Sequence, residues 1–193
     1  FGEMKTQNTY VGFDFEAVWE MQEDNDYPFP TLIANTMIDL PVNSADYMGG
    51  KGTVYDPYKI STKYHLDNVR KNPGSFYVLE NDIIFSEGDF EPSGDFYNLG
   101  TGWQPIGTDS VNSFSGQFDG NGFEITGLKI RQESNVGSNT YFGLFGYNTG
   151  TIKNLGLSAS DIVVSSSNSN IYTGGIAGYN SGGTISTCYN TGS

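Results

Sequence analysis

An internal repeat constrains the fold of this chain more than any other feature of its sequence. The octapeptide Gly-Leu-Phe-Gly-Tyr-Asn-Thr-Gly at residues 143–150 returns as Gly-Ile-Ala-Gly-Tyr-Asn-Ser-Gly at residues 175–182, a spacing of 32 residues. Thr-Ile follows each copy, at Thr151 and at Thr184, and the second copy has gained Gly183. A one-residue insertion of this kind is typical of a turn. Periods of this length indicate stacked repeats that bury their apolar faces against one another.

An earlier and more divergent copy precedes these two at a spacing of 27 residues. Its matching positions are Gly116 with Gly143, Phe118 with Phe145, Asn121 with Asn148, Ile125 with Ile152, Leu128 with Leu155 and Ile130 with Leu157. Within each copy, apolar residues alternate with polar ones, and Asn and Gly interrupt the runs, which favours strands and turns over helices. We therefore expect an all-β fold in which each copy forms one coil of a parallel β-helix, a solenoid of stacked strands.

The repeated positions predict which residues shape the repeat. The structural repeat residues are Gly116, Phe118, Asn121, Gly143, Phe145, Gly146, Asn148, Gly175, Gly178 and Asn180. Gly and Asn both tolerate positive φ, so the segments 119–122 and 148–150 are expected to be corners. Stacked coils would join the three asparagines in a ladder of side-chain amides, and would stack Phe118, Phe145 and Ala177 inside.

Charge and composition exclude several classes of function. The chain has 9 Lys and Arg against 22 Asp and Glu, a net charge of −13, which argues against nucleic-acid binding. The only cysteine, Cys188, allows no internal disulfide framework. No apolar stretch approaches the roughly 18 to 20 residues that span a bilayer, so we expect no membrane insertion. Gly accounts for 26 of 193 residues, and so many turns disfavour a helical fold.

The region just before the repeats has a different organisation. Ser61 or Thr62 can cap a short helix over residues 63–71, which the Asn-Pro-Gly sequence at residues 72–74 ends. Such a helix can cover the end of a solenoid. The segments that follow are expected to be strands at 76–79 and 82–85 and a polar loop at 86–102.

Three regions follow from these patterns. Residues 58–193 are expected to form the β-helix, and residues 33–57, which contain Gly-Gly-Lys-Gly, are interpreted as a linker. Residues 1–32 are acidic and aromatic, with strand candidates at 10–15 and 18–21 and no copy of the repeat. The sequence begins without Met and stops within a repeat, so we interpret it as a piece of a longer protein, truncated at its C-terminal end.

These blocks resemble the GLUG repeats of bacterial surface proteins, which include adhesin-like proteins and the N-terminal regions of Gram-positive immunoglobulin A peptidases. The resemblance rests on the two octapeptides, the first followed by Thr-Ile and the second by Gly-Thr-Ile, and on residues 116–122, which are similar to a first full coil. Residues 57–62 and 76–83 are similar to the segment that starts such an array. Residues 4–32 resemble the segment that closes one, with Phe13 where that pattern usually has Trp.

The resemblance implies a right-handed parallel β-helix on an exported protein, with the end of one array preceding the start of another. It also implies an extracellular location, at the cell surface or in the cell wall. It supplies no catalytic residues, because the peptidases carry a zinc-binding His-Glu-x-x-His helix in a different region. This chain has a single histidine, His65, for which we predict a surface or capping role in the short helix.

Carboxylates are the only plentiful reactive groups in the sequence. Asp82, Asp119, Glu124 and Asp161 could in principle meet on one face of a β-helix and perform the acid and base chemistry of a lyase or glycosidase. Bonding of such side chains to the backbone at turns is the simpler explanation. We therefore predict no catalytic residues in this chain.

Two binding questions stay open in the sequence. The acidic segments 23–26 and 119–122 offer oxygen ligands but match neither the EF-hand nor the nonapeptide calcium repeat, so we expect no cofactor and leave calcium open. Tyr147 and Tyr179 occupy equivalent positions in the two octapeptides. Exposed, they would suit stacking on sugar rings, and buried, they would be ordinary repeat packing, which we favour.

We therefore expect a non-catalytic, extracellular repeat module of a bacterial surface protein, acting as a stalk or as an adhesive surface. The alternative is a carbohydrate-active β-helix, either lyase or glycosidase, or a sugar-binding one. Expected partners are a host or matrix glycan or protein and the neighbouring repeats of the same chain. Nucleic acid and membrane insertion are not expected.

Overall fold

The computed structural model describes residues 19–21, 30–32, 46–132, 140–165 and 170–193. The chain divides into two compact units, Phe1–Ser44 and Ala45–Ser193. In the first unit, strand β1 (Trp19–Met21) pairs antiparallel with β2 (Pro30–Leu32). Strand β1 lies within the strand predicted at 18–21, whereas the strand predicted at 10–15 falls outside the described residues.

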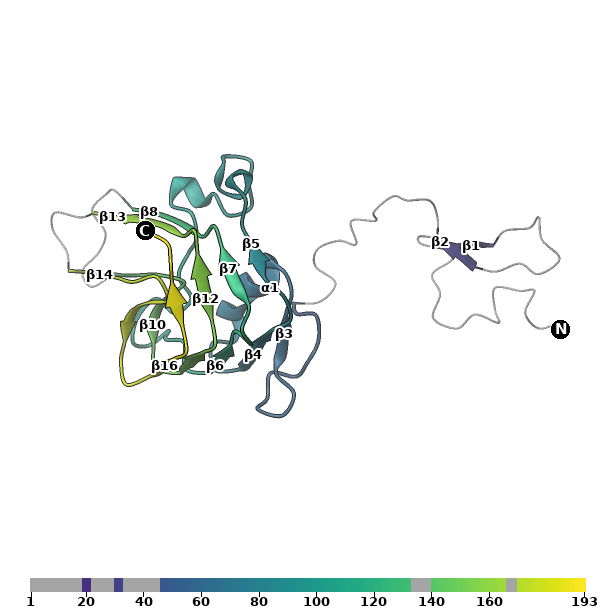
Figure 1. Cartoon of the computed structure of the whole chain (residues 1–193), viewed down its shortest axis with the longest axis horizontal. Helices are drawn as coiled ribbons and strands as arrows, with labels where there is room; N and C mark the ends of the chain where they lie inside the picture. Colours follow the sequence, from purple (N-terminus) through teal and green to yellow (C-terminus); the bar gives the residue numbers. More distant parts are fainter. Residues whose placement is uncertain (1–18, 22–29, 33–45, 133–139, 166–169) are drawn as a thin grey trace. The chain divides into compact units, whose positions relative to one another are not determined.

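The second unit is mostly β-structure, with one short helix among its described residues (Figure 1). The helix is α1 (Lys63–Asn68), and 3₁₀ turns cover Val69–Lys71, Glu87–Phe90 and Asn98–Gly100. The strands are β3 (Tyr58–Ile60), β4 (Phe76–Leu79), β5 (Ile83–Ile84), β6 (Gln117–Asp119), β7 (Glu124–Thr126), β8 (Lys129–Gln132), β9 (Thr140–Phe142), β10 (Phe145–Asn148), β11 (Thr151–Lys153), β12 (Gly156–Ser158), β13 (Asp161–Val164), β14 (Ile171–Thr173), β15 (Ala177–Asn180), β16 (Thr184–Ser186) and β17 (Tyr189–Asn190).

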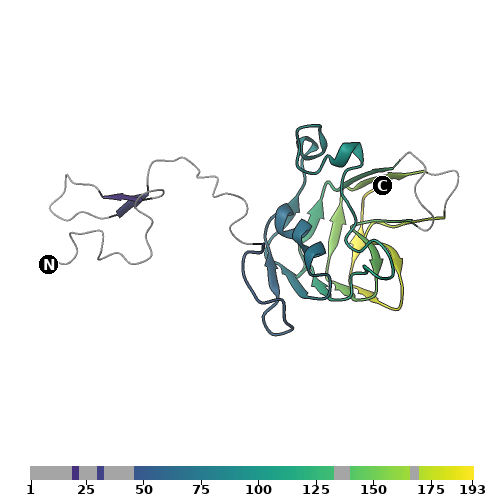
Figure 2. The same ribbon diagram turned by 180° about the vertical axis from the view of Figure 1, so that it is seen from behind.

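The pairs between these strands are all parallel. One sheet has the order β16-β11-β6-β4-β3 and another the order β17-β12-β7-β5, and the remaining pairs are β13-β8, β14-β9 and β10-β15. Partners recur at nearly constant intervals: Phe145 lies opposite Ala177, 32 residues on, and Thr151 opposite Thr184, 33 residues on. Each passage of the chain therefore lies on the previous one (Figures 1 and 2). The passage from β9 to β13 is called the middle layer below, and that from β14 to β17 the last layer.

The register confirms the spacing of 32 and contradicts the spacing of 27. Gly183 lies in the turn before β16, where it lengthens the interval by one residue as predicted. Phe118, however, lies opposite Ile152 and not opposite the residue 27 positions on, and Ile125 lies opposite Leu157. The shorter spacing is wrong because apolar residues alternate in the same way on every face of the stack. A sequence match can therefore join β6 to β10, although these strands belong to different sheets.

The predicted helix forms, with Thr62 as its N-cap. The Thr62 hydroxyl accepts a hydrogen bond from the backbone N–H of His65 at 3.1 Å, which satisfies one of the free donors of the first turn. The α-helix ends at Asn68, and a 3₁₀ turn completes the predicted range. Leu66 and Val69 are fully buried. Because α1 lies at the β3–β4 end of the unit, these side chains close the core at that end (Figures 1 and 2).

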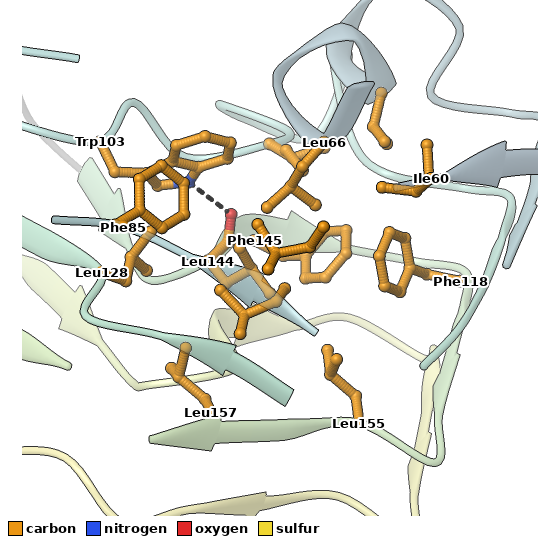
Figure 3. Packing of buried hydrophobic residues seen from close by; sticks show 14 of the residues in the cluster. Ile60, Leu66, Phe85, Trp103, Phe118, Leu128, Leu144, Phe145, Leu155 and Leu157 are labelled. Carbon is orange, nitrogen blue, oxygen red and sulfur yellow. Dashed lines mark hydrogen bonds between the residues drawn. The ribbon is translucent and has the colours of Figure 1, made fainter. Parts of the chain in front are cut away.

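The core runs through the layers as a cluster of aliphatic and aromatic side chains (Figure 3). Phe145 is fully buried, with its ring centroid 4.8 Å from that of Phe114 and 5.5 Å from that of Phe118. Phe145 and Phe118 thus meet across the interior, although they are not strand partners. Leu155 and Leu157 of the middle layer are also fully buried in this cluster.

The segment predicted as a polar loop after β5 contributes aromatic residues to the core. Phe90 and Phe96 are buried beside Phe85, with ring centroids 5.5 Å and 5.1 Å from its ring. Trp103 closes this group and donates its indole N–H to the carbonyl oxygen of Leu144 at 3.1 Å, the dashed line in Figure 3. These two buried rings were not predicted from the sequence because most residues of the segment are polar.

Part of the predicted linker belongs to the second unit. Tyr47 is buried, and its ring stacks on that of Tyr58 with centroids 4.1 Å apart. The backbone N–H of Lys59 donates to the carbonyl oxygen of Gly49 at 2.9 Å. Residues 46–57 therefore run beside β3, and the rest of the predicted linker lies outside the described residues.

Candidate functional site

The asparagines of the two octapeptides meet at the corner between β10 and β11. The Asn148 side chain is fully buried and donates to the Asn180 side-chain oxygen at 2.7 Å, while its own oxygen accepts the Gly150 backbone N–H at 3.1 Å. The predicted ladder therefore exists between these two asparagines. Asn121 does not join it, because its amide donates to the Leu79 carbonyl oxygen at 3.3 Å. The ladder holds the layers together and leaves no buried amide free for a ligand.

Most of the predicted repeat glycines lie where two segments of backbone approach closely. These residues are Gly116, Gly143, Gly146 and Gly178, whereas a Cβ at Gly175 would meet the side chain of Asn190. A Cβ at Gly116 would lie 1.9 Å from the carbonyl oxygen of Ser75, and one at Gly146 would lie 2.3 Å from that of Gly107. Packing between layers thus requires glycine at these two positions.

Two of the four candidate acids are held by basic side chains. The Asp119 carboxylate lies 3.1 Å from the Lys153 ammonium and accepts a hydrogen bond from the Asn154 amide at 3.0 Å, and Asp161 pairs with Arg131. Burial raises the pKa of Asp119, but the hydrogen bonds outweigh it and the pKa lies below its ordinary value. The hydrogen bond from Arg131 lowers the pKa of Asp161.

The other two candidate acids lie beside β5 and β7. Asp82 accepts the backbone N–H of Glu124 at 2.9 Å, and the Glu124 carboxylate accepts the hydroxyls of Tyr189 and Ser158. These two hydrogen bonds lower the pKa of Glu124, that from Tyr189 more strongly. A glycosidase general acid needs a raised pKa to stay protonated near neutral pH. The shifts of Asp119, Glu124 and Asp161 all run in the opposite direction.

The side chain of His65 is hydrogen-bonded to the backbone that precedes helix α1. Its Nδ1 atom accepts the backbone N–H of Ser61 at 3.3 Å, and burial lowers its pKa. Among the residues that the structure describes, no three His, Cys, Asp or Glu side chains gather as metal ligands. Of the two acidic segments considered for calcium, 23–26 lies outside the described residues, and Asp119 already pairs with Lys153.

Four tyrosines from two layers form a surface cluster, called the tyrosine patch below. They are Tyr141 on β9, Tyr147 on β10, Tyr172 on β14 and Tyr179 on β15. The rings of Tyr141 and Tyr172 stack with centroids 5.2 Å apart, and those of Tyr147 and Tyr179 lie 5.1 Å apart. Tyr179 is 38 % exposed and the other three are partly exposed. The prediction that Tyr147 and Tyr179 are both buried is therefore wrong for Tyr179, which is exposed, while Tyr147 is partly buried.

Two members of the tyrosine patch were not predicted. Tyr141 and Tyr172 are strand partners 31 residues apart, close to the repeat spacing. A search for tyrosines at roughly the period of the octapeptides would have found this pair. Burial, followed by the neighbouring tyrosines, raises the pKa of Tyr141 above its ordinary value.

Comparisons with known proteins place the chain beside two longer ones, while no protein-family model matches it. A protein of Evansella cellulosilytica described as "Putative Gly-rich membrane protein" is 39 % identical over 126 residues, which cover 63 % of this chain and 13 % of that protein. A crystal structure described as "a putative immunoglobulin A1 protease from Bacteroides ovatus" covers 77 % of this chain and 41 % of that chain, at 22 % identity and a TM-score of 0.52. The latter likeness shows a shared fold.

These comparisons concern parts of larger proteins. The chain spans about one eighth of the Evansella protein and less than half of the Bacteroides chain. In the part of this chain that the structure describes, helix α1 has six residues, and no helix is long and apolar enough to cross a bilayer.

Proposed function

We propose that this chain is a non-catalytic module of a bacterial surface protein, in which a right-handed parallel β-helix of GLUG-like repeats forms a stalk or an adhesive surface outside the cell. The observation that carries this proposal is the parallel register of β4, β6, β11 and β16, which continues through four passages of the chain. A structure that grows by adding equivalent layers is stiff and extends in one direction, which suits a spacer.

The two comparisons support the surface location. One similar protein is described as a "Putative Gly-rich membrane protein" and the other as "a putative immunoglobulin A1 protease", and enzymes that act on immunoglobulins meet them outside the cell. Because this chain matches only a part of each, the peptidase chemistry itself is not proposed for it. A module that carries or presents another domain is consistent with both.

The environment of the acids supports a non-catalytic role. Asp119 and Asp161 are paired with Lys153 and Arg131, and hydrogen bonds hold the pKa of Glu124 below its ordinary value. Groups of this kind stay ionised and engaged at neutral pH, which suits structural bonds between layers better than proton transfer.

The second candidate function is sugar binding, and the exposure of the tyrosine patch favours it. Tyrosine rings combine an apolar face with a hydroxyl, and surface aromatic clusters are enriched at binding sites. Host or matrix glycans and proteins are the proposed partners of the adhesive surface. The chain would bind them without calcium or another cofactor.

The test is incubation of the purified full chain with pectin, host glycans and protein substrates, with and without calcium, followed by analysis of binding and of products. Binding without turnover is expected for an adhesive surface, and neither binding nor turnover for a stalk. Turnover that disappears in Asp119→Asn or Asp161→Asn would overturn the proposal in favour of a carbohydrate-active enzyme. Surface exposure is tested by labelling intact cells of the source organism with an antibody against the chain.

A further inference from the structure

We propose that a polar groove on the corner of the stack binds an extended, uncharged oligosaccharide. The groove has a volume of about 340 Å³ and is lined by the residues that immediately precede or begin β4, β6, β11 and β16. It is called the corner groove below. This inference rests on the adhesive role proposed above and names a ligand class and a site for it.

The floor of the corner groove follows from the way the layers stack. Five of its lining residues are glycines, including Gly116 and Gly150, where a Cβ would collide with the backbone of the adjacent layer. Because packing excludes side chains at these two positions, the corner is hollow and the hollow continues from one layer to the next. Its volume lies at the lower end of the range of about 300–1,000 Å³ that is usual for small-molecule sites.

One wall of the corner groove is a row of side chains in strand register. Phe76 lies opposite Gln117, Gln117 opposite Thr151, and Thr151 opposite Thr184. Adjacent strands are about 4.8 Å apart, so this row is about 14 Å long. It presents an aromatic ring at one end and then an amide and two hydroxyls, which is a linear arrangement suited to a linear ligand.

The polar groups of this row are available to a ligand. Within the described part of the chain, the side chains of Gln117, Thr151 and Thr184 make no hydrogen bond to another residue and are left to solvent. The amide can donate and accept, and so can each hydroxyl. Sugar hydroxyls also do both, whereas an aliphatic ligand would leave these groups desolvated and unpaired.

The charge of the molecule selects against ionised ligands. No charged residue lines the corner groove, and the chain as a whole carries a net charge of −13. A polyanion would be repelled, and a cationic ligand would find no carboxylate within the groove to pair with. The aromatic ring of Phe76 adds a flat apolar surface on which the C–H face of a pyranose ring can pack. An uncharged chain of pyranose rings fits the free amide and hydroxyl groups, the absence of charged residues and the aromatic surface of the groove.

The proposal is tested by titrating the full chain with cellohexaose and mannohexaose, and in parallel with hexagalacturonate and a Gly-Ser peptide of similar length. Calorimetry and chemical-shift perturbation of the isotope-labelled protein report the binding. We expect one of the two neutral hexasaccharides to bind and to shift the signals of Gln117, Thr151 and Thr184. Preferential binding of the acidic sugar or of the peptide, or absence of binding to either neutral sugar, would overturn the corner groove as a neutral-sugar site.

The decisive variant is Thr151→Val with Thr184→Val, because valine keeps the shape and strand preference of threonine and removes only the hydroxyl. Binding should weaken about tenfold, the expected effect of losing two hydrogen bonds. The same change at the exposed Thr173 of β14, outside the groove, should leave it unchanged. Serine at both positions restores the hydroxyls and should recover most of the affinity. If the double variant unfolds, Gln117→Leu replaces it.

A variant of the tyrosine patch separates this proposal from the adhesive function itself. Tyr179→Ala reports the contribution of the tyrosine patch to sugar binding, because Tyr179 does not line the corner groove. If Tyr179→Ala abolishes binding and the threonine variants do not, the corner groove is wrong and the adhesive function stands on the tyrosine patch. If no sugar binds at all, the corner-groove proposal fails while the stalk role is untouched.

Discussion

The first and the last described layers of the second unit differ in how their apolar side chains are covered. At the β3 end, Ile60 lies beneath helix α1, and Ile60, Leu66 and Val69 are all fully buried. At the opposite end, the described residues of the last layer have a neighbouring layer on one side only, and the side chains of Ile185 and Tyr189 are exposed. The difference shows that an apolar side chain becomes core only when it is covered from both sides.

One pair of residues isolates this effect from amino-acid type. Ile152 and Ile185 are strand partners in the same sheet, on β11 and β16. Ile152 is 0 % exposed and Ile185 is 38 % exposed. The same residue in the same register thus has two environments, and its contribution to stability should differ accordingly.

The largest expected effect is that of Phe145→Ala, in the layer covered on both sides. Its buried ring contacts Phe114 and Phe118, and its removal should lower the free energy of unfolding by about 3–5 kcal/mol. Urea unfolding of the full chain, followed by circular dichroism, measures the change. The matched control is Tyr55→Ala at a ring that is 95 % exposed. Equal losses in the two variants would show that Phe145 is not part of the stabilising core.

The paired variants Ile152→Ala and Ile185→Ala test whether the covered and the uncovered isoleucine contribute differently to stability. Ile152→Ala should cost about 2–5 kcal/mol, because it leaves a cavity between two layers. Ile185→Ala should cost no more than about 1 kcal/mol, since the lost side chain already faces solvent. Urea midpoints of the two variants give the difference. If Ile185→Ala is as costly as Ile152→Ala, the last layer is covered in solution, for example by a second copy.

The sequence predicted the layers that repeat most closely and not those that have diverged. The octapeptides carry enough identical residues to fix Phe145 opposite Ala177. The predicted partner of Phe118 was wrong: Phe118 lies opposite Ile152 and not opposite Phe145. Period-two alternation identifies a buried strand but not the sheet to which the strand belongs. Register between divergent layers depends on loop lengths, which single-sequence patterns do not determine.

The candidate site shows the same limit. Asn148 and Asn180 were predictable because an amide ladder needs only two equivalent positions. The corner groove was not predictable, because the sequence assigns its glycines to turns, and the hollow forms only where the turns of successive layers stack. The aromatic residues Phe90 and Phe96 were missed because they lie in a segment of polar composition, where periodicity gives no signal.

The third prediction concerns the corner that joins the covered middle layer to the last layer. Asn148→Ala should cost about 1–3 kcal/mol, because the variant loses a buried amide that bonds to Asn180 and to Gly150. Asn180→Ala removes the exposed partner of the same hydrogen bond and should cost less. Hydrogen exchange of the amides in β10 and β15 reports the loosening. An Asn148→Ala variant with unchanged exchange would show that the ladder contributes nothing to the contact between layers.

The smallest expected effect is a pH dependence at the helical end. Lys63 of α1 pairs with Asp89, whose carboxylate also accepts the backbone N–H of Ser86 at 2.8 Å and its hydroxyl at 3.0 Å. Burial raises the pKa of Asp89, but the hydrogen bonds from Lys63 and Ser86 outweigh it, so the folded pKa lies below the ordinary 3.8. A lowered pKa stabilises the fold fully above the unfolded value, and this stabilisation is lost as the pH falls through the folded value.

The variant Asp89→Asn tests this end against the other. It should cost about 1 kcal/mol at neutral pH, and the difference from the parent chain should shrink in acid as Asp89 itself becomes protonated. Hydrogen exchange at pH 6 should show faster exchange in α1 and unchanged exchange in β16, because Lys63 belongs to the helix that covers the first end. A uniform increase in both elements would mean that the two ends are one cooperative unit. The contrast between a covered and an open end would then apply to burial and not to local stability.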